Sequence, residues 1–200
     1  MESHTSALPA PMPERITREL LPSGLRLSYR WLNASAYFLV FFCVLWNTFL
    51  VFWYATATAD LDWSKGLDAL LGPRLMMLLF PLLHVAVGIG LTYFTACLFV
   101  NRTVIDVSPR EIRVQVGPLP WRGNLAVAPA QIGQIYREEI VRHTKNGRSV
   151  SYHLSVATKD GKKLKLLSGV PSADQALYLE QEIERHLGIR DQPVTGEMRK

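Results

Sequence analysis

The sequence predicts a membrane α-hairpin joined to an α+β domain, an antiparallel sheet or barrel capped by one C-terminal helix. Segments 34–59 and 75–100 contain none of the chain's 22 basic and 17 acidic residues. After them, apolar and polar residues alternate as in β-strands, and a helical repeat follows over 172–187. This composition excludes a fully soluble protein, a disulfide-dense scaffold and a disordered chain.

Residues 1–33, which precede the first apolar segment, are predicted to be a cytoplasmic N-terminal arm. Within this arm Pro22-Ser23-Gly24 separates two short stretches that suit strands, so a β-hairpin over 16–31 is predicted. Two alternatives are open for it. The hairpin pairs with the sheet edge near Thr103, or it is a mobile arm.

The two apolar segments are each long enough to cross a bilayer, since a core of about 30 Å needs about 20 helical residues. We expect 34–59 and 75–100 to span the membrane, with 60–74 as a short external loop. Cys43 and Cys97 lie inside the spans, so no disulfide framework is predicted. Pro81 is expected to kink the second span, because proline lacks a backbone N–H.

Basic residues next to the spans predict their orientation. Four arginines precede the first span, the external loop holds only Lys65 and Arg74, and Arg102 with further basic sequence follows the second span. Because segments rich in Lys and Arg stay in the cytoplasm, both termini are predicted to be cytoplasmic.

Two costly polar side chains lie inside the spans, Asn47 and His84. Counting about 1.5 Å per residue from the inner ends places them about 20 Å and about 24 Å deep, so we expect them to meet near mid-membrane. Gly88 and Gly90 are expected to let the two backbones approach closely there. An interhelical hydrogen bond is the structural interpretation of His84, and a proton relay or a metal or haem ligand is the functional alternative.

Residues 101–188 are predicted to form the cytoplasmic domain. Five or six antiparallel strands are expected within about 65 residues, with hairpin turns at Asn146-Gly147 and Asp160-Gly161. A stiff turn, Gly117–Trp121, is expected between two of the earlier strands.

The last predicted element is an amphipathic helix over 172–187. Ser172 is its expected N-cap, with Gln175 completing a capping box, and Gly188 ends it before a tail at 189–200. Four apolar residues are predicted to form the buried stripe: Ala176, Leu179, Ile183 and Leu187. Four charged residues are predicted to face water: Glu180, Glu182, Glu184 and Arg185.

Short stretches across the chain carry a resemblance to a known group of proteins: Leu82–Gly88, Asn101–Val104, Gly117–Trp121, Ala176-Leu177 with Glu180 and Ile183-Glu184, and Leu187–Asp191. With these stretches the chain resembles a group of bacterial membrane proteins that have two spans followed by a bacterial pleckstrin-homology-like (PH-like) domain. The resemblance runs from about residue 15 to 197. It implies a PH-like fold and a bacterial inner-membrane location, but the group has no assigned activity.

The positive charge of the predicted domain is concentrated between Arg137 and Lys165. This stretch carries a net +5, equal to the formal net charge of the whole chain. Its eight basic residues are candidates for binding anionic lipid: Arg137, Arg142, Lys145, Arg148, Lys159, Lys162, Lys163 and Lys165. Near an anionic surface each is worth about 1 kcal/mol. The alternative is that they solvate hairpin tips and protect sheet edges.

The Gly117–Trp121 turn is a second candidate binding feature. Its residues Pro118, Leu119, Pro120 and Trp121 suit a rigid hook for a partner or for the membrane interface. The alternative is an ordinary turn whose Trp121 packs into the core.

Catalytic patterns are missing from the sequence, which has no phosphate-binding glycine loop, nucleophile elbow or metal-spaced His or Cys set. We therefore expect neither an enzyme nor a bound cofactor or metal. Nucleic-acid binding is disfavoured, because the basic residues lack a pattern of interleaved aromatics and the domain is tethered to a membrane.

Two functions remain, and a homo-oligomer is compatible with both. The first is a membrane-anchored interaction module that binds a protein partner or anionic lipid headgroups. The second is an accessory subunit of a membrane transporter or respiratory complex that acts through the transmembrane hairpin.

Overall fold

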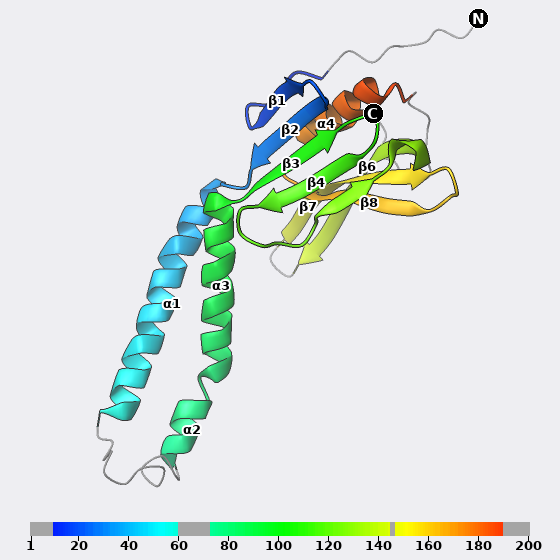
Figure 1. Ribbon diagram of the computed structural model, residues 1–200. Coiled ribbons are helices and arrows are strands. Elements are labelled where there is room, and N and C mark those ends of the chain that lie inside the picture. Colours follow the sequence, from blue (N-terminus) through cyan, green and yellow to red (C-terminus); the bar gives the residue numbers. More distant parts are fainter. Residues whose placement is uncertain (1–9, 60–72, 145–146, 190–200) are drawn as a thin grey trace, which may run out of the picture. The chain divides into compact units, whose positions relative to one another are not determined.

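The computed structural model describes residues 10–59, 73–144 and 147–189 (Figure 1). The chain divides into two compact units. The hairpin unit is Trp31–Asn101, and the β unit combines Met1–Arg30 with Arg102–Lys200. The N-terminal arm thus belongs to the same unit as the C-terminal half of the chain.

The hairpin unit consists of α1 (Ala34–Thr58), α2 (Pro73–Leu79) and α3 (Leu82–Val100), with α1 and α3 side by side (Figure 1). Two stretches, α1 and Leu75–Val100, are long and apolar enough to cross a membrane. The second stretch is interrupted between α2 and α3, where Pro81 is the N-cap of α3. The predicted kink at this proline is therefore confirmed.

A seven-residue spacing governs the contact between α1 and α3. The buried residues of α1 are Ala36, Cys43 and Leu50, and those of α3 include Gly88 and Thr95. Seven residues is the repeat of left-handed helix pairs. Most of these residues are small, which lets the two apolar helices approach closely.

Two antiparallel sheets and one helix make up the β unit. The first sheet contains five strands in chain order: β1 (Ile16–Leu21), β2 (Gly24–Arg30), β3 (Arg102–Val107), β4 (Ile112–Gly117) and β5 (Leu125–Val127). The second sheet contains three: β6 (Ile132–Thr144), β7 (Gly147–Thr158) and β8 (Lys163–Val170). A short 3-10 helix, η2 (Pro129–Gln131), joins the sheets, and α4 (Ala173–Leu187) ends the fold. The antiparallel strands predicted after the hairpin, five or six of them, are found as the six strands β3 to β8, and the C-terminal helix is confirmed.

The predicted 16–31 hairpin joins the first sheet. β1 pairs with β2, and β2 pairs with β3 over six residue pairs that place Tyr29 opposite Thr103. Of the two alternatives, the paired one is correct. Because Trp31–Asn33 lead from β2 into α1 and Asn101 alone links α3 to β3, the whole hairpin unit is inserted between two neighbouring strands.

Helix α4 packs against both sheets, which decides which of its side chains are buried. Its ends follow the predicted signals: the Ser172 hydroxyl accepts the Gln175 N–H at 3.2 Å, and Gly188 takes the left-handed conformation with φ of 67°. Its polar face was predicted wrongly. Glu180, Glu182 and Glu184 are only 1%, 5% and 7% exposed, because a helix lying on two sheets is covered over more than one stripe.

The three buried glutamates of α4 are each bound by a strand residue. In each case the partner is a cation or an amide, which is what a buried carboxylate requires. The pairs are Glu180 with Arg137 on β6, Glu182 with Arg18 on β1 at 2.7 Å, and Glu184 with Gln134 on β6 at 2.6 Å. Polar contacts therefore hold α4 to both sheets.

Candidate functional site

The structure removes Arg137 from the candidate lipid-binding surface. Its side chain is 3% exposed and its guanidinium donates to the Glu180 carboxylate. Alternate residues of a strand share a face, and Ile135, two residues before Arg137, is fully buried. This apolar neighbour on the same face is the sequence signal that identifies Arg137 as an inward-facing residue.

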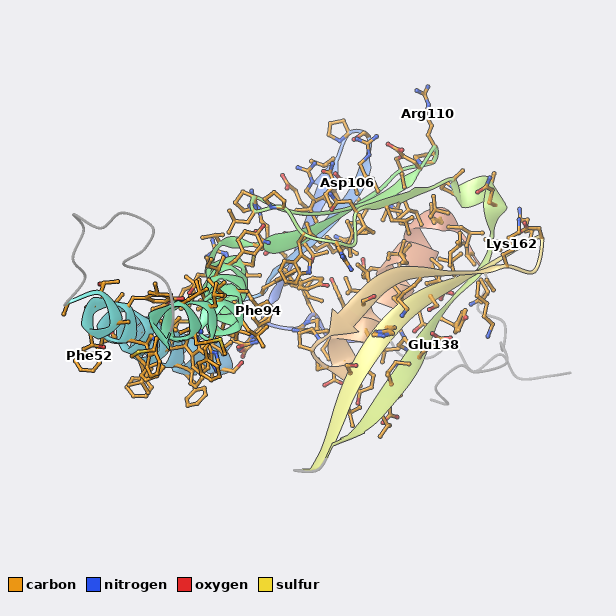
Figure 2. The ribbon with its side chains drawn as sticks, turned by 90° about the horizontal axis from the view of Figure 1, so that it is seen from below. Phe52, Phe94, Asp106, Arg110, Glu138 and Lys162 are labelled. Atoms are coloured by element: carbon orange, nitrogen blue, oxygen red, sulfur yellow. The ribbon has the colours of Figure 1, made fainter. Side chains whose placement is uncertain are left out.

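Four lysines lie together at the turn between β7 and β8, and all four are exposed: Lys159, Lys162, Lys163 and Lys165. We call them the lysine cluster; Figure 2 shows Lys162 at this turn. Asp160 is the single acidic residue within the turn, and it pairs with Lys162 at 2.9 Å. The Nζ of Lys163 lies 5.6 Å from the centre of the Tyr136 ring. The cluster therefore has an excess of positive charge.

The β7–β8 turn is held by the Thr158 hydroxyl. Its oxygen accepts the Lys162 N–H at 3.0 Å, and its single proton is shared between the Lys162 carbonyl, at 2.9 Å, and the Asp160 carboxylate. Hydrogen bonds from Thr158 and then from Lys162 lower the pKa of Asp160. The lysine cluster thus extends from an internally bonded turn.

The remaining basic candidates lie at the other end of β7. Backbone pairing places Arg142 opposite Ser149 and Arg148 opposite His143, and Lys145 falls outside the described residues. At about 3.3 Å per residue, the ten steps along the strand from Arg148 to Thr158 extend for about 33 Å. The basic stretch is therefore divided between two ends of one hairpin.

The turn between β4 and β5 contains the candidate hook. Pro118 and Pro120 are exposed, Leu119 is half-buried and Trp121 is 37% exposed, so the alternative of a core tryptophan is wrong. Nearby, the Asn124 side chain accepts the Val116 N–H at 2.8 Å, which ties the turn back to β4.

Asn47 and His84 do not meet, contrary to the expectation from depth alone. The amide of Asn47 donates to the Cys43 carbonyl at 2.7 Å and to the Thr92 hydroxyl at 3.1 Å. Side chains of a helix point toward its N-terminus. In an antiparallel pair this direction leads Asn47 toward the C-terminal half of α3, where Thr92 lies, and away from His84.

His84 instead forms an aromatic contact. Its ring lies 5.7 Å from that of Trp46, nearly parallel at 23°, and 5.7 Å from that of Phe80. Among the described residues the His84 side chain does not form the expected interhelical hydrogen bond; a different one runs from the Trp46 indole to the His84 backbone carbonyl at 3.1 Å. Within the described part of the chain, the buried Nδ1 of His84 has no hydrogen-bond partner.

Two aromatic residues of α1 bind backbone carbonyls at the break before α3. Pro81 has no N–H to offer the Met77 carbonyl four residues earlier, and the Trp53 indole donates to that oxygen at 3.0 Å. The Tyr54 hydroxyl donates to the Leu78 carbonyl at 3.1 Å. Free carbonyls at broken membrane helices bind ions in transporters, whereas these two carbonyls already have donors. Sequence reasoning missed this role.

Gly88 and Gly90 differ in what surrounds them. A Cβ on Gly88 would lie 3.1 Å from Trp46 and 3.3 Å from both Asn47 and Leu50, so the predicted close approach is confirmed there. A Cβ on Gly90 would meet nothing within 4 Å, and the prediction is wrong for that residue.

Substituting leucine for each glycine separates the two cases. We expect Gly88→Leu to cost about 1–3 kcal/mol through overpacking of the helix contact, and Gly90→Leu to change stability by no more than about 0.5 kcal/mol. Thermal unfolding of the full chain in mild detergent measures both. Equal losses in the two variants contradict the assignment of Gly88 to the helix contact.

A cleft of about 220 Å³ lies between the β1–β2 turn and the β3–β4 turn. Arg26 and Asp106 flank it with a bidentate pair at 2.6 and 3.1 Å, and Glu111 binds Arg113 at 2.6 Å. The hydrogen bond and charge of Asp106 raise the pKa of Arg26. Each acid is matched by a base, so the cleft offers no excess charge.

Comparison with known proteins adds no assignment to these sites. A scan against protein-family models gives no match, and a search of curated proteins gives none either. Among the described residues, no three His, Cys, Asp or Glu side chains form a group that suits a metal ion. The proposal for this chain therefore rests on its own fold and surfaces.

Proposed function

We propose that the chain is an integral protein of the bacterial inner membrane that holds a PH-like interaction module at the cytoplasmic surface. Its two apolar helices span the bilayer, both termini are cytoplasmic, and the β unit binds a protein partner or anionic lipid headgroups. The proposed role is binding and not catalysis.

The insertion of the hairpin unit between β2 and β3 carries this proposal. These strands are hydrogen-bonded neighbours, and neighbouring strands lie about 4.7–4.9 Å apart. Two covalent links therefore leave the β unit side by side, and each of them joins the unit to one of the two apolar helices. Two antiparallel sheets followed by one helix are compatible with a PH-like fold, and a module attached in this way acts only at the membrane surface.

The lysine cluster supports anionic headgroups as one ligand of the module. We expect the β7–β8 turn to exchange amide hydrogens several-fold more slowly when the full chain sits in nanodiscs with acidic lipid than in neutral ones. Each lysine near such a surface is worth about 1 kcal/mol. Replacing the four lysines with glutamine is expected to remove the difference, as is high salt.

The β3–β4 turn, which carries the exposed Arg110, is the internal control for this exchange measurement (Figure 2). Equal exchange of the β7–β8 turn in acidic and neutral nanodiscs removes the lysine cluster from the proposal. The full chain is required, because a fragment that begins at residue 101 lacks β1 and β2.

A protein partner is tested by replacing the spans. In a chain whose segments 34–59 and 75–100 are exchanged for an unrelated helical hairpin, β2 and β3 still pair. Partners that co-purify in mild detergent with both chains bind the β unit. Partners lost from the exchanged chain bind the hairpin, which contradicts the proposal and favours an accessory subunit of a transporter or respiratory complex.

The accessory-subunit alternative has weaker support from the hairpin unit. Of its two costly polar residues, the amide of Asn47 is bound by Cys43 and Thr92 within the unit, and both carbonyls at the helix break have donors from α1. The buried Nδ1 of His84 is the one such group without a partner among the described residues. Groups satisfied in this way do not require a further helix or an ion.

A further inference from the structure

Two arginines lie opposite each other where the first sheet continues into the helices. Arg30 is the last residue of β2, Arg102 is the first of β3, and their Cα atoms are partners in the ladder. Both residues are exposed. The Cβ atoms of such partners lie about 4.5–5.5 Å apart on one face, and like charges placed there destabilise a sheet.

Neither arginine has a counter-charge in the part of the chain that the structure describes. No described carboxylate lies within ion-pair distance of Arg30 or Arg102. The nearest acid on the same face of β3 is Asp106, and Arg26 binds both of its oxygens. No described acidic side chain therefore compensates the positive charge of the pair.

The surroundings of the arginine pair leave room for an anion and offer further donors. The strand partner beside Arg102 is Gly117, where a Cβ would meet nothing within 4 Å. Along the same face the next row of partners is Ser28, Val104 and Gln115. That row presents a hydroxyl and an amide, and neither row contains an acidic side chain.

Chain connectivity keeps this site close to the ends of the spans. At no more than about 3.6 Å per residue, Arg102 lies within about 7 Å of Val100 and Arg30 within about 14 Å of Ala34. The headgroup layer begins where the helices leave the hydrocarbon core. Given the proposed membrane insertion, on which this step rests, both guanidinium groups reach that layer.

We infer that Arg30 and Arg102 together bind the phosphate of an anionic phospholipid in the cytoplasmic leaflet. Guanidinium forks match phosphate oxygens in bidentate fashion, and two of them stand side by side on neighbouring strands, with the open position at Gly117 next to Arg102. The bound phosphate also removes the repulsion between the opposed side chains. This site is separate from the lysine cluster, which lies on the second sheet.

Native mass spectrometry of the full chain, released from nanodiscs of phosphatidylcholine with phosphatidylglycerol, tests the site. Wild type is expected to retain one phosphatidylglycerol in preference to phosphatidylcholine. In the double variant Arg30→Gln, Arg102→Gln the ratio of retained phosphatidylglycerol to phosphatidylcholine is expected to fall about tenfold. A tenfold change corresponds to the loss of one charge-assisted contact. The variant Arg30→Lys, Arg102→Lys keeps the charge but not the fork, and it is expected to lose most of the preference as well.

Arg110→Gln is the matched control, because it removes an exposed arginine at the β3–β4 turn and is expected to keep the wild-type preference. The site is overturned if the double glutamine variant retains phosphatidylglycerol as wild type does. It is also overturned if the Arg110→Gln control loses the lipid to the same extent as the double variant. Retention unchanged in the lysine variant overturns the fork geometry in favour of diffuse attraction.

Two further measurements are needed. One distinguishes a lipid ligand from free phosphate, and the other distinguishes a failure of the arginine site from a failure of membrane insertion. The affinity of inorganic phosphate is measured for the wild-type chain in nanodiscs of neutral lipid alone. If inorganic phosphate binds as tightly as phosphatidylglycerol does, the proposal that the ligand is a lipid is overturned. Carbonate extraction tests membrane insertion separately. Release of the wild-type chain by carbonate contradicts the proposed function itself, whereas loss of lipid preference in an inserted chain bears on Arg30 and Arg102 alone.

Discussion

Replacing Glu180 with alanine is expected to lower the free energy of unfolding of the β unit by about 3–5 kcal/mol. The substitution leaves the Arg137 guanidinium, which is 3% exposed, without its carboxylate. Removing one member of a buried pair costs more than the pair itself contributes, because the remaining charge stays desolvated. Arg137→Ala is expected to have an effect of similar size.

Urea unfolding of the full chain in mild detergent, followed by pulse proteolysis of the β unit, measures this loss. Glu111→Ala is the control: it breaks an ion pair whose side chains are 41% and 50% exposed, and it is expected to cost no more than about 1 kcal/mol. The double variant Arg137→Met, Glu180→Leu is expected to recover most of the stability. A single variant as mild as the control contradicts the buried pair.

Gly24→Ala is the second substitution with a large expected effect. Gly24 begins β2 with φ of 151°, and a Cβ there would lie 2.0 Å from the carbonyl oxygen of Val107. A backbone oxygen in a paired strand cannot move aside as a flexible side chain does. We expect a loss of about 3–5 kcal/mol, at the upper end of what single substitutions cost, because the steric overlap adds to the strained backbone. Because Val107 lies at the end of β3 that pairs with the start of β2, faster amide exchange in both strands is expected.

Gly161→Ala separates steric overlap from conformational strain alone. Gly161 also has positive φ, 81°, but a Cβ there would meet nothing within 4 Å. We expect it to cost about 1 kcal/mol. The same unfolding measurement applies, and equal losses at the two glycines exclude the contact with Val107 as the cause.

The elements of this fold were predictable where the signal is local. The charge-free stretches marked α1 and α3, Pro81 marked the break, and Ser172 and Gly188 marked the ends of α4. Each signal acts over a few residues, through backbone hydrogen bonding or the repeat of apolar side chains. Such signals do not depend on what lies far away in the chain.

The candidate sites depended on pairings across long stretches of chain. Ile135 indicates which face of β6 carries Arg137, but the partner of Arg137, Glu180, is 43 residues away. From helical periodicity alone, Glu180 was predicted to be exposed. Depth along the helices suggested that Asn47 meets His84, whereas side-chain direction leads Asn47 to Thr92. Arg30 and Arg102 became neighbours only through the register of β2 and β3.

The sequence by itself determined two apolar helices, a run of antiparallel strands, a final amphipathic helix and an excess of positive charge. The repeat of apolar residues, the capping of helices and the composition depend only on residues that are close together in the sequence. They can therefore be predicted before the fold is known. The tertiary structure alone decided that the helices are inserted into a sheet, that three glutamates are buried and that two arginines stand side by side. These depend on which distant strands pair, because pairing chooses the neighbour that each charge meets.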